Sequence, residues 1–362
     1  MKKFKGFERG MGIGGWLTNY KRFNVLPDER RMVLTVGDFE HFDTYITESD
    51  VSYIASLGMD HIRLGFDQIV LEEEPGVYRE HIFSLIENFI CLCRKYGLNT
   101  VLNLHKAIGN YCDIKEEATL LDDDALHGRF INLWLAIEER FKNYPTVAFE
   151  LLNEVRDVDP EKWNNLAEKT IKALRSVNKE RILIIGSTAW NSPKTLEYLK
   201  VFDDENVVYT FHMYDPDSFT HQQGVLQERQ CLYNRKMPYP GDIERYRDFE
   251  RVLFGRENTY EGYERMDRRV IWDLMEGAKR FIEKNPDKIL WCGEFGTIRH
   301  ARLEWREAYM RDVIAFLKEN EIPYSVWNYL STPNDGNRFS LVDDENRKIL
   351  SEELHRIILG EV

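Results

Sequence analysis

Eight short apolar runs, separated by segments with helical periodicity, restrict how this chain can fold more than any other feature. Each run is nearly continuous in hydrophobic residues, as strands buried on both faces of a parallel sheet tend to be. The runs cover residues 10–15, 60–66, 99–105, 146–157, 181–187, 206–214, 288–297 and 322–329. Strands that alternate with helices predict an α/β fold, and eight such units predict a closed (β/α)8 TIM barrel.

The segments between the runs carry the signals of helices. Residues 48–58 open with serine and acidic residues and end at a glycine, as a capped helix does. Further helices are expected at residues 124–141 and 162–177, with a short one at 193–200. One helical face repeats apolar residues at the expected spacing, at Ile82, Leu85, Ile86, Phe89, Ile90 and Cys93.

One interval is too long for an ordinary loop of a barrel. Residues 215–265 are rich in tyrosine, arginine and glutamate and contain the turn signal MPYPGD. We predict that they form an inserted subdomain between strand 6 and helix 6 of a single domain spanning residues 1–362. The alternative is a disordered insertion, and the aromatic residues Phe219, Tyr233 and Tyr239 argue against it.

Charge and cysteine content limit the classes of partner. The net charge of −13 opposes binding to phosphate backbones, so no nucleic acid partner is expected. No apolar run reaches 18 residues and no apolar stretch follows the N-terminal lysines, so we expect neither membrane insertion nor a signal peptide. The five cysteines, Cys91, Cys93, Cys112, Cys231 and Cys292, form no CxxC pair and favour a reducing, cytoplasmic location. Nothing in the sequence indicates an oligomeric state.

Polar side chains stand at the carboxyl ends of the runs. These ends meet around one bowl in a barrel, so the side chains are expected to face one another. They are Arg63, His105, Asn153, Glu154, His212, Tyr214, Glu294 and Trp327. Glu154 and Glu294 belong to the fourth and seventh runs, from which inward-pointing side chains could flank a sugar ring.

Two carboxyl groups on either side of a glycosidic bond are what glycoside hydrolysis requires. One must be protonated, to give a proton to the departing oxygen. The other must be ionised, to attack the anomeric carbon or to activate water. Arg63 and Tyr214, with the two histidines, are available to keep Glu294 ionised, since hydrogen bonds and cations lower a carboxyl pKa. Asn153 could bond a sugar hydroxyl, and Trp327 could present a flat apolar face to the sugar.

The strand motifs resemble those of glycoside hydrolase family 5, the cellulase branch of retaining barrel glycosidases. They are HIRLGF, LNLHKA, FELLNEV, YTFHMYDP, WCGEFGT and YSVWNY, with GIGGWL near the N-terminus. The resemblance implies that Glu154 is the acid/base, that Glu294 is the nucleophile, and that the other six residues support them. The chain departs from many relatives at Gly65, where they have proline, and at Lys106, where a second histidine is familiar.

The segments EHFDTYITESDV and YNRKMPYPG, and the strand-6 insertion, resemble a clostridial cytoplasmic-type endoglucanase and lichenase subgroup. This implies a retaining endo-β-glucanase that acts on β-1,4 or mixed β-1,3/1,4 glucans or oligosaccharides, with no cofactor. We also expect no metal, because the sequence has neither an HExxH pattern nor a cysteine–histidine cluster.

Two tryptophans, Trp16 after the first run and Trp190 after the fifth, could be sugar platforms or could pack at the edge of the barrel. Other functions also stay open. An exo-acting β-glucosidase or β-1,3-glucanase, or a β-mannanase, would use the same fold, and a catalytically inactive barrel could only bind glucan. A Schiff-base enzyme would need a lysine at a strand end, where Lys106 is the nearest candidate.

Overall fold

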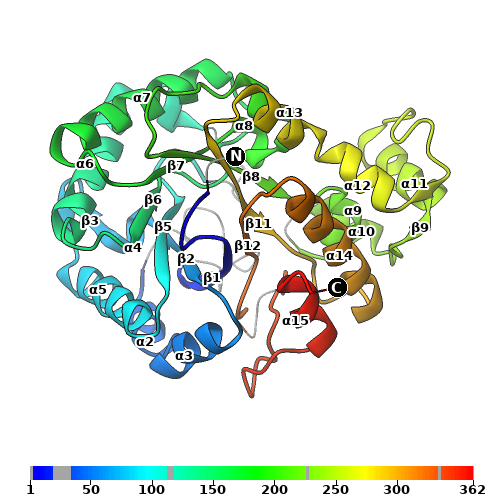
Figure 1. The fold of residues 1–362 in the computed structure, drawn as a ribbon, viewed down its shortest axis with the longest axis horizontal. Coiled ribbons are helices and arrows are strands. Elements are labelled where there is room, and N and C mark those ends of the chain that lie inside the picture. The colour runs from blue at the N-terminus through cyan, green and yellow to red at the C-terminus, as the bar shows by residue number, and fades with distance from the viewer. Residues whose placement is uncertain (1–2, 19–33, 112–117, 226–227, 333–335, 362) are drawn as a thin grey trace.

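A closed barrel of eight parallel strands forms the centre of the computed structural model, which describes residues 3–18, 34–111, 118–225, 228–332 and 336–361 (Figure 1). The order around the barrel is β1-β12-β11-β8-β7-β6-β5-β2. The strands are β1 (Arg9–Leu17), β2 (His61–Asp67), β5 (Asn99–Lys106), β6 (Val147–Glu150), β7 (Leu183–Gly186), β8 (Val207–Met213), β11 (Ile289–Phe295) and β12 (Tyr324–Val326). The predicted (β/α)8 barrel is confirmed.

Helices surround the barrel and connect its strands. The main ones are α2 (Val36–Thr44), α3 (Glu48–Ser56), α5 (Glu80–Lys95), α6 (Asp124–Phe141), α7 (Pro160–Val177), α12 (Arg268–Leu274), α13 (Glu276–Lys284), α14 (Leu303–Glu319) and α15 (Glu352–Ile358). Shorter elements are α4 (Gln68–Leu71), β3 (Glu72–Glu74), β4 (Val77–Tyr78), η2 (Thr119–Leu121), α8 (Thr188–Asn191) and η3 (Pro193–Tyr198). Helix α6 has the predicted bounds because Asp123 caps it, accepting from the backbone amides of Ala125 and Leu126.

Several strands are shorter than predicted, and β6 and β12 differ most. The fourth run was expected to be extended to residue 157, but β6 ends at Glu150. Glu154 lies in the following loop with a φ of 45°, a left-handed conformation that a strand cannot contain. Strand β12 ends at Val326, so Trp327 comes directly after it.

The floor of the barrel is apolar. Phe4 and Phe7 stack with ring centroids 4.5 Å apart, and Phe4 meets Trp291 of β11 edge-on at 6.3 Å. They form a buried cluster with inward-facing residues near the start of the strands, Val101, Ala148, Ile184, Val208 and Ile289. The N-terminal segment therefore closes the barrel at the end opposite the carboxyl ends of the strands.

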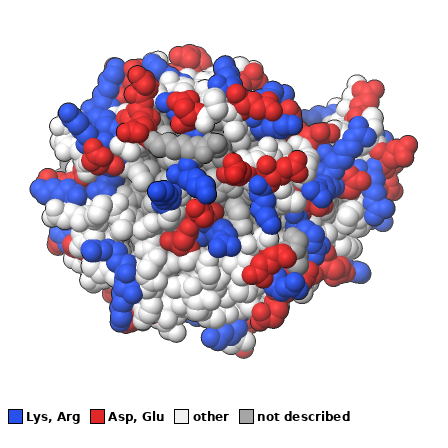
Figure 2. Space-filling model, in the orientation of Figure 1, with Lys and Arg blue, Asp and Glu red and all other residues white. Residues whose placement is uncertain are grey.

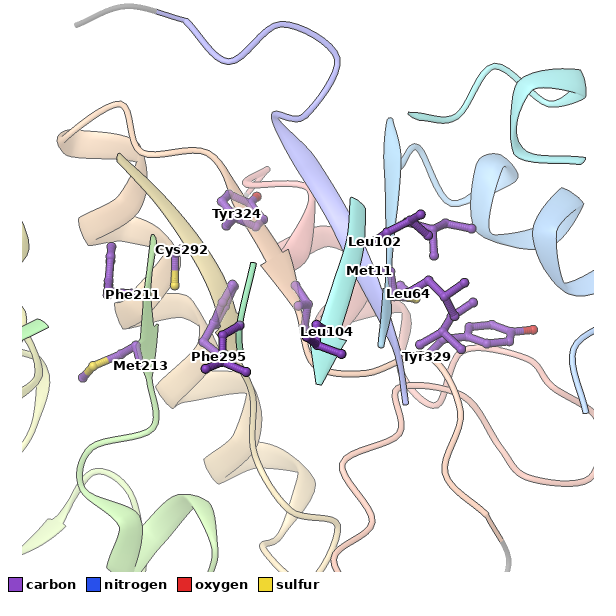
Figure 3. Packing of buried hydrophobic residues seen from close by; sticks show 14 of the residues in the cluster. Met11, Leu64, Leu102, Leu104, Phe211, Met213, Cys292, Phe295, Tyr324 and Tyr329 are labelled. Carbon is purple, nitrogen blue, oxygen red and sulfur yellow. The ribbon is translucent and has the colours of Figure 1, made fainter. Parts of the chain in front are cut away.

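The outward face of the barrel packs against the helices. Leu64, Leu102 and Leu104 come from neighbouring strands β2 and β5, and Phe211 and Cys292 from β8 and β11 (Figure 3). All belong to one large cluster of buried residues. The strands are thus covered by side chains on both faces, which explains why their sequences are continuously apolar.

The residues after β8 form a lobe at the side of the barrel (Figure 1, right). Its elements are α9 (Asp217–Thr220), α10 (Glu228–Tyr233), β9 (Gly241–Asp242), α11 (Ile243–Phe254) and β10 (Arg265–Met266). Phe219 and Tyr239 are fully buried, and each packs against Tyr309 of α14. The Tyr239 hydroxyl also donates to Asp312 at 2.6 Å. These contacts are those of a packed segment and argue against a disordered insertion.

The surface carries both signs of charge, interspersed over the face in Figure 2. None of the helices in the described ranges is long and apolar enough to cross a membrane. Cys91, Cys93, Cys231 and Cys292 are free thiols, and Cys112 lies outside the described residues.

Candidate active site

A buried arginine organises the centre of the site. Arg63 of β2 has no exposed surface. Its guanidinium donates twice to Glu150, at 2.6 and 2.9 Å, and once to Asn153 Oδ1 at 2.7 Å. Its remaining terminal nitrogen donates to Glu294 Oε1. One planar cation therefore fixes two carboxylates and an amide, because its donors point in directions set by its rigid fork.

A β-bulge turns Glu294 toward the barrel axis. In the pairing of β11 with β8, Cys292 is opposite Phe211 and Glu294 is opposite His212, so Gly293 is an extra residue. A Cβ on residue 293 would lie 2.7 Å from Thr210 Oγ1 and 3.2 Å from His212 Nε2. Glycine is thus what lets β11 approach β8 closely enough to place Glu294 beside His212.

Glu154 reaches the site from the loop after β6. Its Oε1 lies 2.9 Å from His212 Nδ1, and its side chain is 20% exposed, whereas that of Glu294 is only 5% exposed. His212 Nδ1 also lies 3.8 Å from Glu294 Oε2. One imidazole nitrogen therefore stands between the two carboxyl groups.

The carboxyl groups are close together. One oxygen of Glu154, one of Glu294 and a ring nitrogen of His212 all lie within 4.8 Å of one another. Three such donors could also hold a metal ion. Glu294, however, already accepts from Arg63 and from the Tyr214 hydroxyl, the latter at 2.9 Å. We therefore interpret the group as machinery for proton transfer, and the absence of a metal stays a prediction.

An aromatic wall borders the carboxyl groups. The ring of Trp327 stacks on His105, with centroids 5.5 Å apart and planes 9° from parallel. A Cβ at Gly12 or Gly14 of β1 would come within 2.7 or 2.5 Å of the indole ring. The glycines of the GIGG motif thus provide the space in which Trp327 lies.

Burial decides how these groups titrate. It lowers the pKa of His212 to about 4, against the attraction of Glu294, and lowers the pKa of His105 well below its ordinary value, with a further contribution from Arg63. Burial also raises the pKa of Glu294, while the positive charge of Arg63 opposes this effect. The histidines are neutral at pH 7, so among them and Arg63 the arginine supplies the positive charge that favours ionised Glu294.

The two tryptophans considered as sugar platforms, and the lysine considered for a Schiff base, lie in different environments. Trp16 is buried among core residues and donates its indole N–H to Phe42 O at 2.7 Å, so the structure favours packing over a platform. Trp190 is 44% exposed, which is compatible with a sugar platform. Lys106 is buried 3.9 Å from Asp67, and this ion pair argues against an amine free to form a Schiff base.

Three further residues take part although the sequence did not single them out. Glu150 is the bidentate partner of Arg63, Gly293 forms the bulge, and Asn191 Nδ2 lies 3.2 Å from His212 Nε2. Glu150 could have been identified from the sequence, because a carboxylate inside a continuous apolar run needs a buried cation as its partner. The roles of Gly293 and Asn191 depend on pairing and backbone conformation, which produce no comparable pattern.

The motifs at the strand ends now have a common geometry, and comparison with known proteins agrees with it. Residues 28–332 match the model of the family described as cellulase, glycosyl hydrolase family 5. The chain belongs to glycoside hydrolase family 5. This family 5 protein is accordingly a glycoside hydrolase.

Several relatives of this family 5 enzyme are similar over most of its length. Endoglucanase C of Acetivibrio thermocellus is 35% identical, with 97% of this chain and 98% of that protein covered. Cellodextrinase A of Ruminococcus flavefaciens is 32% identical over 82% of this chain and 78% of that protein. Among solved structures, endoglucanase Cel5A of Thermotoga maritima has a TM-score of 0.73 at 24% identity, covering 98% of this chain and 97% of its own.

Proposed function

We propose that the protein is a retaining endo-β-glucanase in which Glu294 is the nucleophile and Glu154 the acid/base. The observation that carries this proposal is the approach of their oxygens to within 4.8 Å of each other. Retaining glycosidases place their carboxyl groups about 5–5.5 Å apart, whereas inverting enzymes need roughly 6.5–9.5 Å to admit a water molecule. The spacing thus supports a direct attack on the sugar.

The environments of the two carboxyl groups support this division of roles. Glu294 is buried and accepts from Arg63 and Tyr214, which stabilise the anion that must attack. Glu154 is more exposed, as befits a group that must reach both a leaving group and an incoming water molecule. The two carboxyl groups thus lie in different environments, as an acid and a nucleophile in one site usually do.

The reaction then proceeds in two displacements. A Glu294 oxygen forms a bond to the anomeric carbon while the glycosidic C–O bond breaks, and the proton of Glu154 passes to the departing oxygen. A water molecule next attacks the anomeric carbon, Glu154 takes its proton, and the bond to Glu294 breaks. Two inversions retain the configuration at the anomeric carbon.

The name of the relative Endoglucanase C supports β-glucan as the substrate of this chain. The proposed targets are β-1,4 and mixed β-1,3/1,4 linkages. The similarity to a protein named Cellodextrinase A supports a second candidate, action on short cello-oligosaccharides. A cytoplasmic location remains a prediction, and it would suit imported oligosaccharides. A time course on mixed-linkage glucan and on cello-oligosaccharides separates the two candidates: early release of oligosaccharides from the glucan indicates endo action on the polymer, and cleavage of cello-oligosaccharides with little release from the glucan indicates the second candidate. Monosaccharide as the sole product would indicate exo action.

Substitution of the two glutamates tests the roles. Glu154→Gln is expected to lower kcat/KM on β-glucan by about 10²–10⁴-fold, the usual contribution of general acid catalysis. Its effect on kcat/KM of aryl glycosides with activated leaving groups should be much smaller, because kcat/KM reports the first displacement, in which these groups depart without proton donation. Glu294→Gln should abolish turnover of both substrates and covalent labelling by a 2-fluoro sugar.

Glu304→Gln provides the control for these variants, because this glutamate at the start of α14 has a side chain that is 63% exposed. It should behave as the unmodified enzyme. Equal losses of Glu154→Gln on both substrates would remove Glu154 from the acid role, and labelling of Glu294→Gln would place the nucleophile elsewhere. NMR of the first-formed sugar should show the retained anomer.

A further inference from the structure

The turn after β7 has an unusual backbone that points two side chains in opposite directions. Ala189, Trp190 and Asn191 have φ values of 52°, 58° and 56°. Left-handed conformations cost roughly 1–2 kcal/mol per residue for amino acids other than glycine, so surrounding contacts must hold this turn. The turn leaves Trp190 44% exposed and buries Asn191 completely.

Asn191 is fitted into the barrel next to His212. Its Nδ2 lies 3.2 Å from His212 Nε2. Residue 186, at the end of β7, is a glycine, and a Cβ there would overlap the Asn191 amide. The site thus provides a space shaped for this side chain.

The contact with Asn191 defines which nitrogen of His212 carries the proton. An amide nitrogen only donates, so Nε2 accepts and the ring proton is on Nδ1. That proton points to Glu154 Oε1 at 2.9 Å, with Glu294 Oε2 at 3.8 Å. The opposite orientation of the amide would require a proton on Nε2, and only a protonated Glu154 could then donate to the Nδ1 lone pair. A proton on Nδ1, by contrast, is accepted by Glu154 whether that carboxyl group is protonated or ionised. The surrounding network, from which such orientations are assigned, therefore favours the first arrangement.

The same turn also binds the loop that carries Glu154. The backbone amide of Trp190 donates to Val155 O at 2.9 Å, and that of Ala189 donates to Arg156 O at 3.2 Å. The turn accordingly contacts both the backbone next to Glu154 and the imidazole that binds its carboxyl group.

We propose that Asn191 is a positioning residue, which selects the Nδ1–H tautomer of His212 and thereby orients the Glu154 carboxyl group for proton transfer. The inference rests on the proposed function, in which Glu154 is the acid/base. A donor of fixed position at Oε1 restricts rotation of the carboxyl group, and general acid catalysis depends on such alignment.

Nitrogen-15 NMR of the histidine rings tests the tautomer without any measurement of activity. The His212 signals are identified by their loss in His212→Gln. The unmodified protein at pH 7 is expected to show a protonated Nδ1 and an unprotonated Nε2. Asn191→Asp, which is nearly the same size but presents only acceptors, should bring a proton to Nε2. A protonated Nε2 in the unmodified protein, or an unprotonated Nε2 in Asn191→Asp, would overturn the proposal.

Kinetics test the consequence for Glu154. Asn191→Gly removes the amide while tolerating the left-handed backbone, since glycine adopts positive φ without strain. We expect kcat/KM on β-glucan to fall by about tenfold, a part of what general acid catalysis contributes. The kcat/KM of activated aryl glycosides, which reports only the first displacement, should change little. Equal losses on both substrates, or no loss on either, would contradict the proposal.

Asn164→Ala is the matched control. Asn164 of α7 is also buried, and its amide donates to Tyr198 O at 3.0 Å, outside the site. Asn164→Ala should change the rates on β-glucan and on aryl glycosides to the same extent. Thermal unfolding shows whether each variant is folded. If Glu154→Gln itself lowered the rates on both substrates equally, the proposed role of Glu154 would be wrong. The NMR result would still decide the tautomer.

Discussion

At the scale of single residues, the site depends on the partners that hold each charge. Arg63 is shared by Glu150, Asn153 and Glu294, and it has no contact with solvent. Removing one member of a buried, hydrogen-bonded ion pair typically costs about 3–5 kcal/mol, because the other charge remains buried without compensation. The network therefore links stability of the barrel to the arrangement of the candidate nucleophile.

The pH dependence of the enzyme should reflect the surroundings of Glu294. Its pKa is raised by burial, so activity should be lost on the acid side at a higher pH than an ordinary glutamate would give. Tyr214→Phe removes a donor to the ionised carboxylate and should raise this pKa further. The acid-side inflection of kcat/KM against pH should then move to higher pH.

Tyr263→Phe serves as the control, because Tyr263 also donates to a carboxylate, Asp273 at 2.6 Å, but outside the site. Its profile should match that of the unmodified enzyme. An acid-side inflection that stays in place or moves to lower pH in Tyr214→Phe would show that Glu294 does not control this limb.

Residue patterns in the sequence were sufficient to bring together most of the site. Arg63, His105, His212 and Glu294 were expected at one end of the barrel because each belongs to an apolar run of fixed direction, and the structure places them there. Trp16 shows the limit of such reasoning. A tryptophan after a strand can face the bowl or the helices, and only tertiary packing decides between them.

At the scale of elements, the β-bulge in β11 determines the direction of the Glu294 side chain. Side chains alternate along a strand, so Glu294 would share the outward face of Cys292 if β11 were regular. The extra residue Gly293 reverses this orientation. A pattern of period two cannot reveal an inserted residue, which is why the sequence located Glu294 on the strand without explaining its direction.

Gly293→Ala tests the bulge. The new Cβ would lie 2.7 Å from Thr210 Oγ1, so β11 and β8 would have to shift. A misplacement of about 1 Å in a reacting group can cost on the order of 10²-fold in rate, and overpacking typically costs about 1–3 kcal/mol of stability. We expect kcat/KM on β-glucan to fall about 10²-fold. The protein should remain folded, with a modestly lower unfolding temperature.

Gly128→Ala in α6 is the corresponding control, since a Cβ there meets no atom within 4 Å. It should retain full activity and be neutral or slightly stabilising, as alanine favours helices over glycine by about 1 kcal/mol. Unchanged kcat/KM in Gly293→Ala would mean that the bulge tolerates a side chain and does not fix Glu294.

Element boundaries followed local chemistry where such chemistry existed. The start of α6 was predictable from Asp123, a capping residue before an amphipathic segment. The end of β6 was not, because the apolar sequence continues past Glu150, and the backbone amides of Leu151 and Asn153 still donate to Ile184 O and Leu104 O of the neighbouring strands. The backbone turns into the left-handed conformation at Glu154, which no propensity of glutamate predicts.

At the scale of the whole molecule, the barrel has an apolar floor and a polar mouth. The eight alternating units were enough to predict this architecture, since few other folds accommodate so many buried parallel strands. The folding of the segment after β8 into α9, α10 and α11 was not predictable element by element. Its burial against α14 depends on contacts between segments distant in sequence.

The separation of floor and mouth predicts that stability and activity can be altered independently. Phe7 is 2% exposed and stacks on Phe4, so Phe7→Ala should destabilise the protein by about 3–5 kcal/mol. Below the unfolding transition, kcat on β-glucan should be unchanged, because the floor does not contact the carboxyl groups. Denaturant unfolding and steady-state kinetics measure the two effects.

Val177→Ala at the end of α7 is the control, since this valine is 62% exposed and should lose little stability. A loss of kcat in folded Phe7→Ala would show that packing at the floor is transmitted to the site.

The position of Phe4 and Phe7 beneath the strands also determines how the enzyme could be attached to a solid carrier. A linker joined to the chain ahead of Phe4 would leave from the side opposite the glucan entrance. Immobilised molecules would then present their entrances outward, accessible to a polymer too large to diffuse beneath them.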